Sequence, residues 1–147
     1  MKIITIADVE YLAFRLAKEH QSFDELIPDF STRFPNILEG CVLTPFQRFS
    51  GKALYTTLVA KASILFYLLI KNHPFQNRNN RIAITILLTF LYINNKWLKA
   101  DTQELYNFTG RAAQSPAPLK DQVIAAIQKF IRDYLADAEY NMAIKAK

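Results

Sequence analysis

Glycine and cysteine are both scarce in this 147-residue chain, which has three glycines and a single cysteine, Cys41. So few glycines are atypical of a turn-rich all-β fold, because tight hairpin turns favour residues that accept positive φ. One cysteine excludes an intrachain disulfide and is typical of a reducing compartment. Half of the residues are hydrophobic, which excludes a disordered chain, and the length suits one domain with one core.

Long apolar runs are also missing. The two most apolar stretches, "AKASILFYLLI" and "IAITILLTFLYI", are both shorter than the roughly 20 residues that span a bilayer. Near the N-terminus, Asp8 and Glu10 stand where a signal peptide would have its apolar segment. We therefore expect a cytoplasmic protein that has no membrane partner.

Negative charge is absent from the middle of the chain. All thirteen acidic residues lie outside the segment from Gly40 to Ala100, whereas eight cationic residues lie inside it: Arg48, Lys52, Lys61, Lys71, Arg78, Arg81, Lys96 and Lys99. Such an unbalanced positive field suits an anionic partner such as a nucleotide or a nucleic acid. The alternative is that these are ordinary solvated surface cations, and this reading is preferred for Lys96 and Lys99, which flank Trp97.

Apolar residues recur at helical spacing over most of the chain, which predicts an all-α fold. Two helices that are apolar nearly all round are expected at its centre, joined by a short polar loop. We expect a single domain over residues 1–140 and a frayed tail over residues 141–147. The predicted elements are helices over 5–20, 52–72, about 80–95, 101–114 and 119–140, short helical pieces and turns over 22–40, and a loop or short flap over 41–51. In the final helix, five side chains are predicted to face inward: Val123, Ile127, Phe130, Ile131 and Tyr134.

The joint between the two central helices reads "KNHPFQNRNNR", residues 71–81, and concentrates hydrogen-bonding and cationic groups. Pro74 is expected to end the first helix, because proline disfavours helix in the residue before it. The N-terminus of the second helix offers unpaired N–H groups and partial positive charge, which suits a phosphate. Asn79 is expected to cap this helix, and Arg78 and Arg81 to donate charge-assisted hydrogen bonds.

His73 and Phe75 complete this predicted anion site. A loop histidine beside a phosphate can act as a general base, and Phe75 is expected to turn inward and anchor the loop on the core. The same pattern is also explained by a purely structural role, in which the asparagines cap helices, the arginines are solvated and His73 is structural. Short motifs match by chance often, and the spacing alone leaves both readings open.

The stretch "HPFQNRNNRIA" resembles the signature of the Fic/Doc (Fido) family, H-x-F-x-[D/E]-G-N-G-R in Fic proteins and H-x-F-x-D-A-N-K-R-T-A in the Doc, or death-on-curing, branch. The preceding "LYTTLVAKA" and the following "LLTFLYINN" resemble the flanking core helices of that family. The likeness extends from Ile4 to Asn107 and, together with the short chain, favours the Doc-type toxin branch. It implies a Fido-type helical bundle around two buried helices joined by the motif loop.

The resemblance implies a transferase that moves AMP or a phosphoryl group from a nucleoside triphosphate such as ATP onto a hydroxyl group of a target protein. By this likeness His73 is the general base, Phe75 the core anchor, and Asn79 and Arg81 phosphate ligands, with Arg78 and Asn80 beside them. The implied partners are a target protein in translation, such as an elongation factor, and an antitoxin, since the inhibitory sequence pattern of Fic proteins is absent.

Three positions of the motif depart from the family pattern. Asn77 stands where an acidic residue holds Mg²⁺, so a magnesium site here would be weak, because asparagine supplies a carbonyl oxygen but no charge. Arg78 stands where the family has Gly or Ala, and Asn80 where it has Gly or Lys. In addition, Ile84 replaces the second arginine of the Fic signature.

Three functions remain open from the sequence. The first is a Doc-like, toxin-type transferase, and it is preferred because His73 and Arg81 are both present. The second is a catalytically degenerate Fido protein that binds a nucleotide or a partner without turnover. The third, a nucleic-acid-binding protein, is disfavoured because the acid-free stretch is mostly apolar helix without aromatic residues interleaved with exposed cations.

Overall fold

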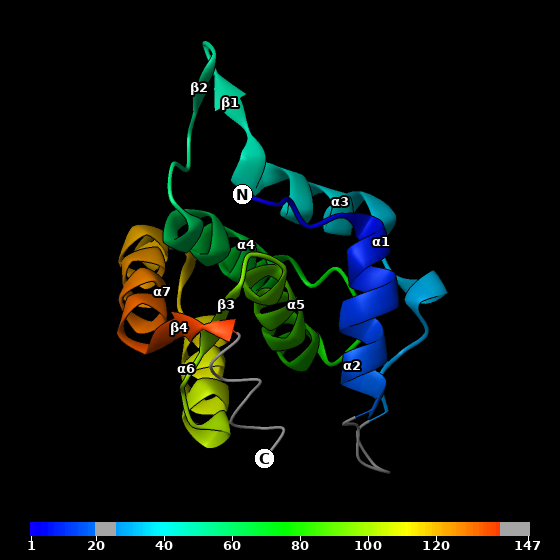
Figure 1. Cartoon of the computed structure of the whole chain (residues 1–147). Helices are drawn as coiled ribbons and strands as arrows, with labels where there is room; N and C mark the ends of the chain where they lie inside the picture. The colour runs from blue at the N-terminus through cyan, green and yellow to red at the C-terminus, as the bar shows by residue number, and fades with distance from the viewer. Residues whose placement is uncertain (20–25, 139–147) are drawn as a thin grey trace.

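The architecture is helical throughout, apart from two short strand pairs (Figure 1). The structure is a computed structural model, and it describes residues 1–19 and 26–138. The predicted all-α class is confirmed. Within those two ranges, no helix combines the length and the apolar character needed to cross a membrane.

The first helical stretch comprises α1 (Ile6–Asp8), a single π-helical turn η1 (Val9–Ala13) and α2 (Phe14–Glu19). A capping box fixes its start: the Thr5 hydroxyl accepts a hydrogen bond from the Asp8 backbone N–H at 3.1 Å, and the Asp8 carboxylate accepts one from the Thr5 N–H at 3.0 Å. The predicted N-terminal helix is therefore confirmed.

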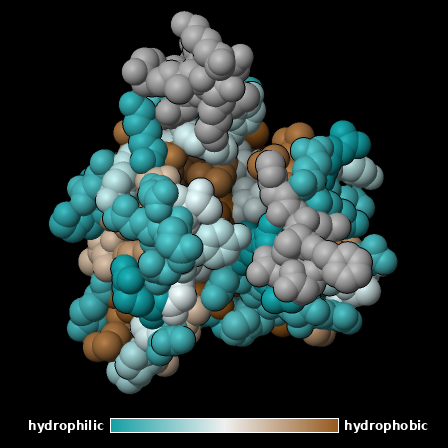
Figure 2. Space-filling view, turned by 90° about the horizontal axis from the view of Figure 1, so that it is seen from below, coloured by the Kyte–Doolittle hydropathy of each residue, from teal (hydrophilic) through white to brown (hydrophobic). Residues whose placement is uncertain are grey.

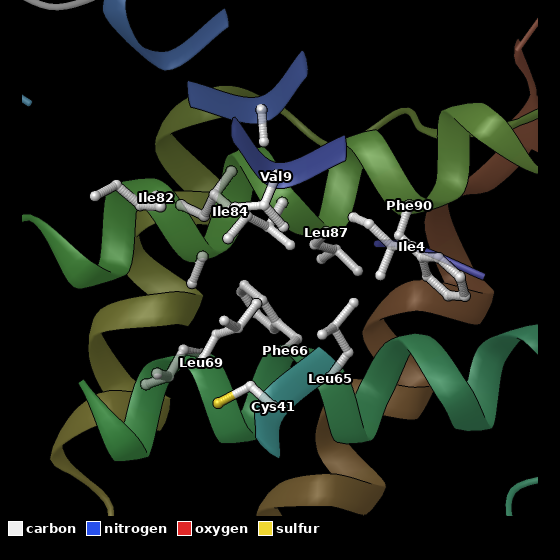
Figure 3. Close-up of a cluster of buried hydrophobic side chains, with 14 of the residues drawn as sticks. Ile4, Val9, Cys41, Leu65, Phe66, Leu69, Ile82, Ile84, Leu87 and Phe90 are labelled. Carbon is white, nitrogen blue, oxygen red and sulfur yellow. The ribbon is translucent and has the colours of Figure 1, made fainter. Parts of the chain in front are cut away.

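Two buried helices, α4 (Leu58–Asn72) and α5 (Asn79–Ile93), form the centre of the molecule. Figure 3 shows Leu65, Phe66 and Leu69 of α4 pointing toward Leu87 of α5, with Val9 of the first helical stretch packed above them. Because apolar residues cover nearly every face of both helices, each can be surrounded by other elements. The predicted central pair is confirmed.

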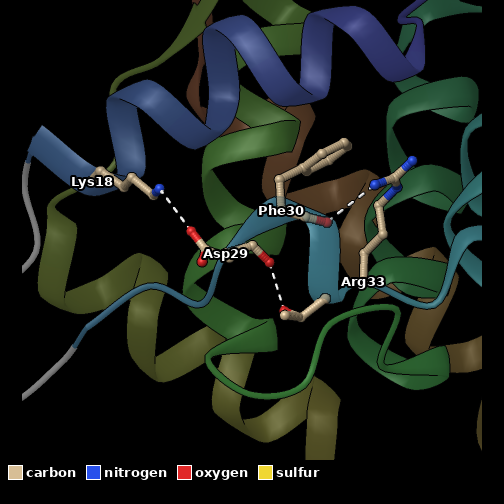
Figure 4. Close-up of polar contacts among 5 residues, drawn as sticks. Lys18, Asp29, Phe30 and Arg33 are labelled. Atoms are coloured by element: carbon tan, nitrogen blue, oxygen red, sulfur yellow. Dashed lines mark hydrogen bonds and ion pairs between the residues drawn. The ribbon is translucent and has the colours of Figure 1, made fainter.

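Between the first helical stretch and α4, the chain forms η2 (Phe30–Thr32), α3 (Pro35–Leu43), η3 (Thr44–Phe46) and a hairpin. The short helical pieces predicted over 22–40 are confirmed for residues 26–40, and residues 22–25 lie outside the described residues. Local polar contacts hold the turn at η2, as Figure 4 shows. The Asp29 carbonyl accepts from the Thr32 hydroxyl at 2.6 Å, the Phe30 carbonyl accepts from the Arg33 guanidinium at 3.2 Å, and the Asp29 carboxylate lies 3.8 Å from Lys18 Nζ.

The loop or short flap predicted over 41–51 is wrong for its first half, because α3 and η3 continue to Phe46. The second half belongs to a β-hairpin, β1 (Arg48–Phe49) paired antiparallel with β2 (Lys52–Ala53), which projects from the helices in Figure 1. Its two turn residues, Ser50 and Gly51, have φ values of 51° and 78°. Positive φ at both positions is typical of the two-residue hairpin turn whose backbone twist matches the right-handed twist of the strands. The prediction that the helix begins at Lys52 is therefore wrong. Helix α4 begins at Leu58, where the Thr57 hydroxyl caps it by accepting from the Ala60 N–H at 3.0 Å.

The C-terminal part contains β3 (Lys96–Leu98), α6 (Thr102–Gln114), η4 (Ala117–Leu119), α7 (Lys120–Tyr134) and β4 (Leu135–Asp137). The strands β3 and β4 pair antiparallel, with Trp97 opposite Ala136. The prediction of a helix through residue 140 is wrong, because the chain leaves the helix after Tyr134 to pair with β3. The predicted tail, residues 141–147, lies outside the described residues.

The face of the molecule seen in Figure 2 is mainly hydrophilic, with hydrophobic side chains in small areas between polar ones. Some exposed large apolar side chains among the described residues come from separate elements, for example Ile3, Leu43 and Phe49. Isolated exposures of this kind are ordinary for a folded chain. Tyr11, Leu12 and Tyr92, in contrast, line one hollow, which is described below.

Candidate functional site

Two residues of the motif loop, residues 73–81, lie in the left-handed region of the backbone map. His73, which caps the C-terminus of α4, has φ 48°, and Arg78, which precedes α5, has φ 57°. Neither residue is glycine, so each conformation costs about 1–3 kcal/mol and persists only where the surroundings impose it. Strain of this kind is concentrated at functional sites.

Contacts with the core hold the middle of the loop. Phe75 is 2% exposed, and its ring centroid lies 5.0 Å from that of Phe14, which in turn packs edge-on against Phe30. One residue earlier, the Pro74 carbonyl accepts a hydrogen bond from the Phe34 N–H at 2.8 Å. The loop is thus anchored on the first helical stretch and on the start of α3, while His73 remains exposed.

Asn79 closes the loop on itself. Its side-chain oxygen accepts from the Phe75 N–H at 3.0 Å, and its side-chain nitrogen donates to the Phe75 carbonyl at 2.9 Å. The prediction that Asn79 caps α5 is wrong, because Arg78 occupies the N-cap position and Asn79 is the first helical residue. Both ends of the Asn79 amide are used to fix the loop, and a phosphate would have to share them.

A pocket of about 400 Å³ opens over the loop and the start of α5. It is lined by six residues: His73, Arg78, Asn79, Asn80, Arg81 and Tyr106. The structure thus brings together five of the predicted site residues. Phe75 lies in the core beside the loop, and Asn77, which is exposed, is not part of the lining.

Tyr106 is the lining residue that sequence reasoning missed. It is half-buried on α6, which packs against both central helices, and the Lys71 ammonium ties the end of α4 to the end of α6 by donating to the Ala113 carbonyl at 3.1 Å. The sequence gives only a weak signal, because Tyr106 is separated from the motif by 25 positions and lies in an ordinary amphipathic pattern.

The electrostatics of this pocket are one-sided. Of the described residues that line it, two carry a guanidinium group and none carries a carboxylate. Glu104 is the acid closest in sequence to Tyr106, and its carboxylate accepts a hydrogen bond from the Tyr134 hydroxyl at 2.6 Å, which raises the pKa of Tyr134. The N–H groups of the first turn of α5 add partial positive charge, since Arg78 caps the helix without a side-chain hydrogen bond. The pocket can therefore attract an anion.

The same residues do not fit a magnesium ion. Hard cations prefer several oxygen ligands with carboxylates among them, and Asn77 offers one neutral carbonyl oxygen. Among residues 1–19 and 26–138, no group of three or more His, Cys, Asp or Glu side chains is placed to hold a metal. The expected weak magnesium position at Asn77 is therefore not part of such a cluster.

A second hollow, of about 440 Å³, lies between the first helical stretch and the end of α5 and is lined mainly by apolar side chains, among them Leu12, Leu16, Tyr92 and Trp97. None of the motif residues borders it. Its lining lacks the paired cations and the histidine that a transfer reaction on a phosphate requires, so the pocket over the motif loop is the better candidate site.

Comparison with protein families supports the family that the motif resembles. The model of the Fic/DOC family matches residues 3–91, which is more than half of the chain. No curated protein and no solved structure matches the chain. The matched segment includes both central helices and the whole motif loop.

Proposed function

Because this chain belongs to the Fic/DOC family, we propose that it is a nucleotide-dependent transferase that moves AMP or a phosphoryl group onto a hydroxyl group of a target protein. The observation that carries the proposal is the pocket in which His73 meets Arg78 and Arg81 at the start of a helix. The proposed substrate is a nucleoside triphosphate, with ATP the first to test.

His73 acts as the general base. It takes the proton from the target hydroxyl as the hydroxyl oxygen attacks a phosphorus atom of the nucleotide. For AMP transfer, the oxygen bonds to the α-phosphorus, and the bond to the bridging oxygen breaks, so that pyrophosphate leaves with the electron pair. For phosphoryl transfer, the attack is on the γ-phosphorus and ADP leaves. A positioned base contributes about 10² to 10⁴ in rate.

Arg78, Arg81 and the first N–H groups of α5 hold the phosphates. Guanidinium groups can donate two parallel hydrogen bonds to phosphate oxygens and spread the charge that develops as the leaving group departs. Asn79 keeps these groups in place through its two hydrogen bonds to Phe75. Tyr106 also lines the pocket, and we assign its ring to stacking with the base of the nucleotide.

The finer assignment follows the Doc branch. We propose a toxin-type protein that modifies a component of translation, such as an elongation factor, and that is inhibited by a partner antitoxin. The support is the order of the residues around the motif, because the family match is common to all branches.

Label transfer tests the proposal and identifies the group moved. The purified chain is incubated with a cell extract and with ATP labelled at either the α- or the γ-phosphate. AMP transfer moves only the α-label onto protein, and phosphoryl transfer moves only the γ-label. His73→Ala should abolish transfer. Gln76→Ala, an exposed position in the same loop that does not line the pocket, should leave it unchanged.

A binding protein without turnover is the second candidate. Two observations favour it: Asn77 stands where the family motif has its acidic residue, and no carboxylate is among the described residues that line the pocket. In that case calorimetry would detect ATP binding by the unmodified chain. The chain itself would transfer neither the α-label nor the γ-label to any protein. Absence of both binding and label transfer would contradict both candidates.

A further inference from the structure

We propose that the motif pocket binds its nucleotide as the metal-free anion and that the guanidinium of Arg78 replaces the divalent cation. This inference rests on the proposed function, since it concerns how the same pocket neutralises phosphate charge. Its starting point is that the residues at the motif pocket do not fit a magnesium ion.

Two adjacent departures from the family motif compensate in charge. A divalent cation held by one carboxylate presents one net positive charge to the phosphates. Here Asn77 is neutral and Arg78 carries one positive charge, so the pair presents the same net charge without a metal. With Asn77 but not Arg78, and without a metal, these positions would present no positive charge to the phosphates. With Arg78 added to a carboxylate and its metal, they would present more than one.

The position of Arg78 fits this role. It occupies the N-cap of α5 in the left-handed conformation, a place that favours glycine, and its side chain lines the pocket. From there it lies beside the helix N-terminus at which phosphates bind. A guanidinium remains charged at any physiological pH and can bridge two phosphate oxygens, as a metal ion does.

Among the described residues that line the pocket, none is an acid that would recruit a metal. The sequence has no carboxylate between Gly40 and Ala100, and the carboxylate of Glu104 accepts a hydrogen bond from Tyr134. A nucleotide that carries Mg²⁺ has lost two of its negative charges to the ion. It should therefore be attracted less by Arg78 and Arg81 than the free nucleotide is.

Calorimetric titration with ATP, first with EDTA and then with excess Mg²⁺, tests the inference on the full chain. The unmodified chain should bind ATP in EDTA, and excess Mg²⁺ should weaken binding about tenfold or more, which corresponds to the loss of one charged hydrogen bond. The double variant Asn77→Asp with Arg78→Gly restores the family pattern at both positions and should reverse the order, so that binding requires Mg²⁺.

Arg78→Gly alone separates charge from folding. Glycine suits the left-handed position, so this variant should fold at least as stably as the parent, while its affinity for ATP in EDTA falls about tenfold or more. Arg132→Ala removes an exposed arginine of α7 outside the pocket and should change neither the folding stability nor the affinity for ATP.

Each outcome decides the inference. Binding by the unmodified chain that requires Mg²⁺, or is unaffected by it, would overturn the inference and leave the proposed function standing. No ATP binding under either condition would overturn both. Metal-free binding without label transfer would support the inference and contradict the transferase.

Discussion

Replacement of Asn79 tests whether this side chain holds the motif loop. Its amide makes two partly buried hydrogen bonds to the backbone of Phe75, at 3.0 and 2.9 Å. A hydrogen bond contributes about 0.5–1.5 kcal/mol net, so Asn79→Ala should lower the free energy of unfolding by about 1–3 kcal/mol. Urea denaturation followed by circular dichroism measures this difference.

Asn79→Asp divides the effect between the two hydrogen bonds. An aspartate can still accept from the Phe75 N–H, but it cannot donate to the Phe75 carbonyl. Its second carboxylate oxygen and the Phe75 carbonyl oxygen would repel each other. It should therefore also destabilise the chain, and its negative charge should weaken phosphate binding as well. Asn79→Ala, in contrast, adds no charge to the pocket.

Asn80→Ala is the matched control, because Asn80 is the next residue of α5 and lines the same pocket. A half-exposed position without a structural role changes stability by less than about 0.5 kcal/mol. If Asn79→Ala were as stable as Asn80→Ala, the account of how the loop is held would be refuted.

Three further changes follow from the same structure. Phe75→Ala should cost about 3–5 kcal/mol of unfolding free energy by denaturation, because the ring is almost fully buried against Phe14; a cost below 1 kcal/mol would contradict its anchoring role. Tyr106→Ala should weaken ATP binding in calorimetry by about fivefold or more, whereas Tyr106→Phe should retain it, since stacking needs only the ring; equal losses would argue against stacking. Burial raises the pKa of the Cys41 thiol from 9.0 to about 11, with a smaller opposing effect from the Asn72 side chain, so the folded state favours the neutral thiol. The stability that the neutral thiol contributes is complete below pH 9 and is lost as the pH rises toward 11. In thermal unfolding curves, Cys41→Ala should therefore lose less stability over this pH range than the unmodified chain does; identical pH profiles for the two proteins would contradict this prediction.

Much of the fold could be predicted from the sequence because its signals are local. The apolar periodicity of residues 58–72 and 79–93, the break at Pro74, and the Thr5–Asp8 capping box are all contained in short stretches. The pairing of β3 with β4 is not local, since Trp97 and Ala136 come together from distant parts of the chain. The predicted final helix therefore ran too far, because amphipathic periodicity gives no sign of a strand partner.

The residues of the candidate site also differ in whether a local sequence signal reveals them. His73, Phe75 and Arg81 could be singled out because the motif places them within one short loop. Tyr106 could not, because only tertiary packing brings α6 to that loop. The role of Asn79 was misread for a different reason: the left-handed turn at Arg78 shifts the cap by one residue and frees the Asn79 amide to bind Phe75.

The central claim is that His73 activates a target hydroxyl for transfer from a nucleotide, and mass spectrometry of modified hydroxyl groups tests it most directly. Extract proteins incubated with ATP and the unmodified chain should gain an adenylyl or a phosphoryl group on Ser, Thr or Tyr, and the same sites should be unmodified with His73→Ala. Equal modification by the two proteins, or none with the unmodified chain, would contradict the claim.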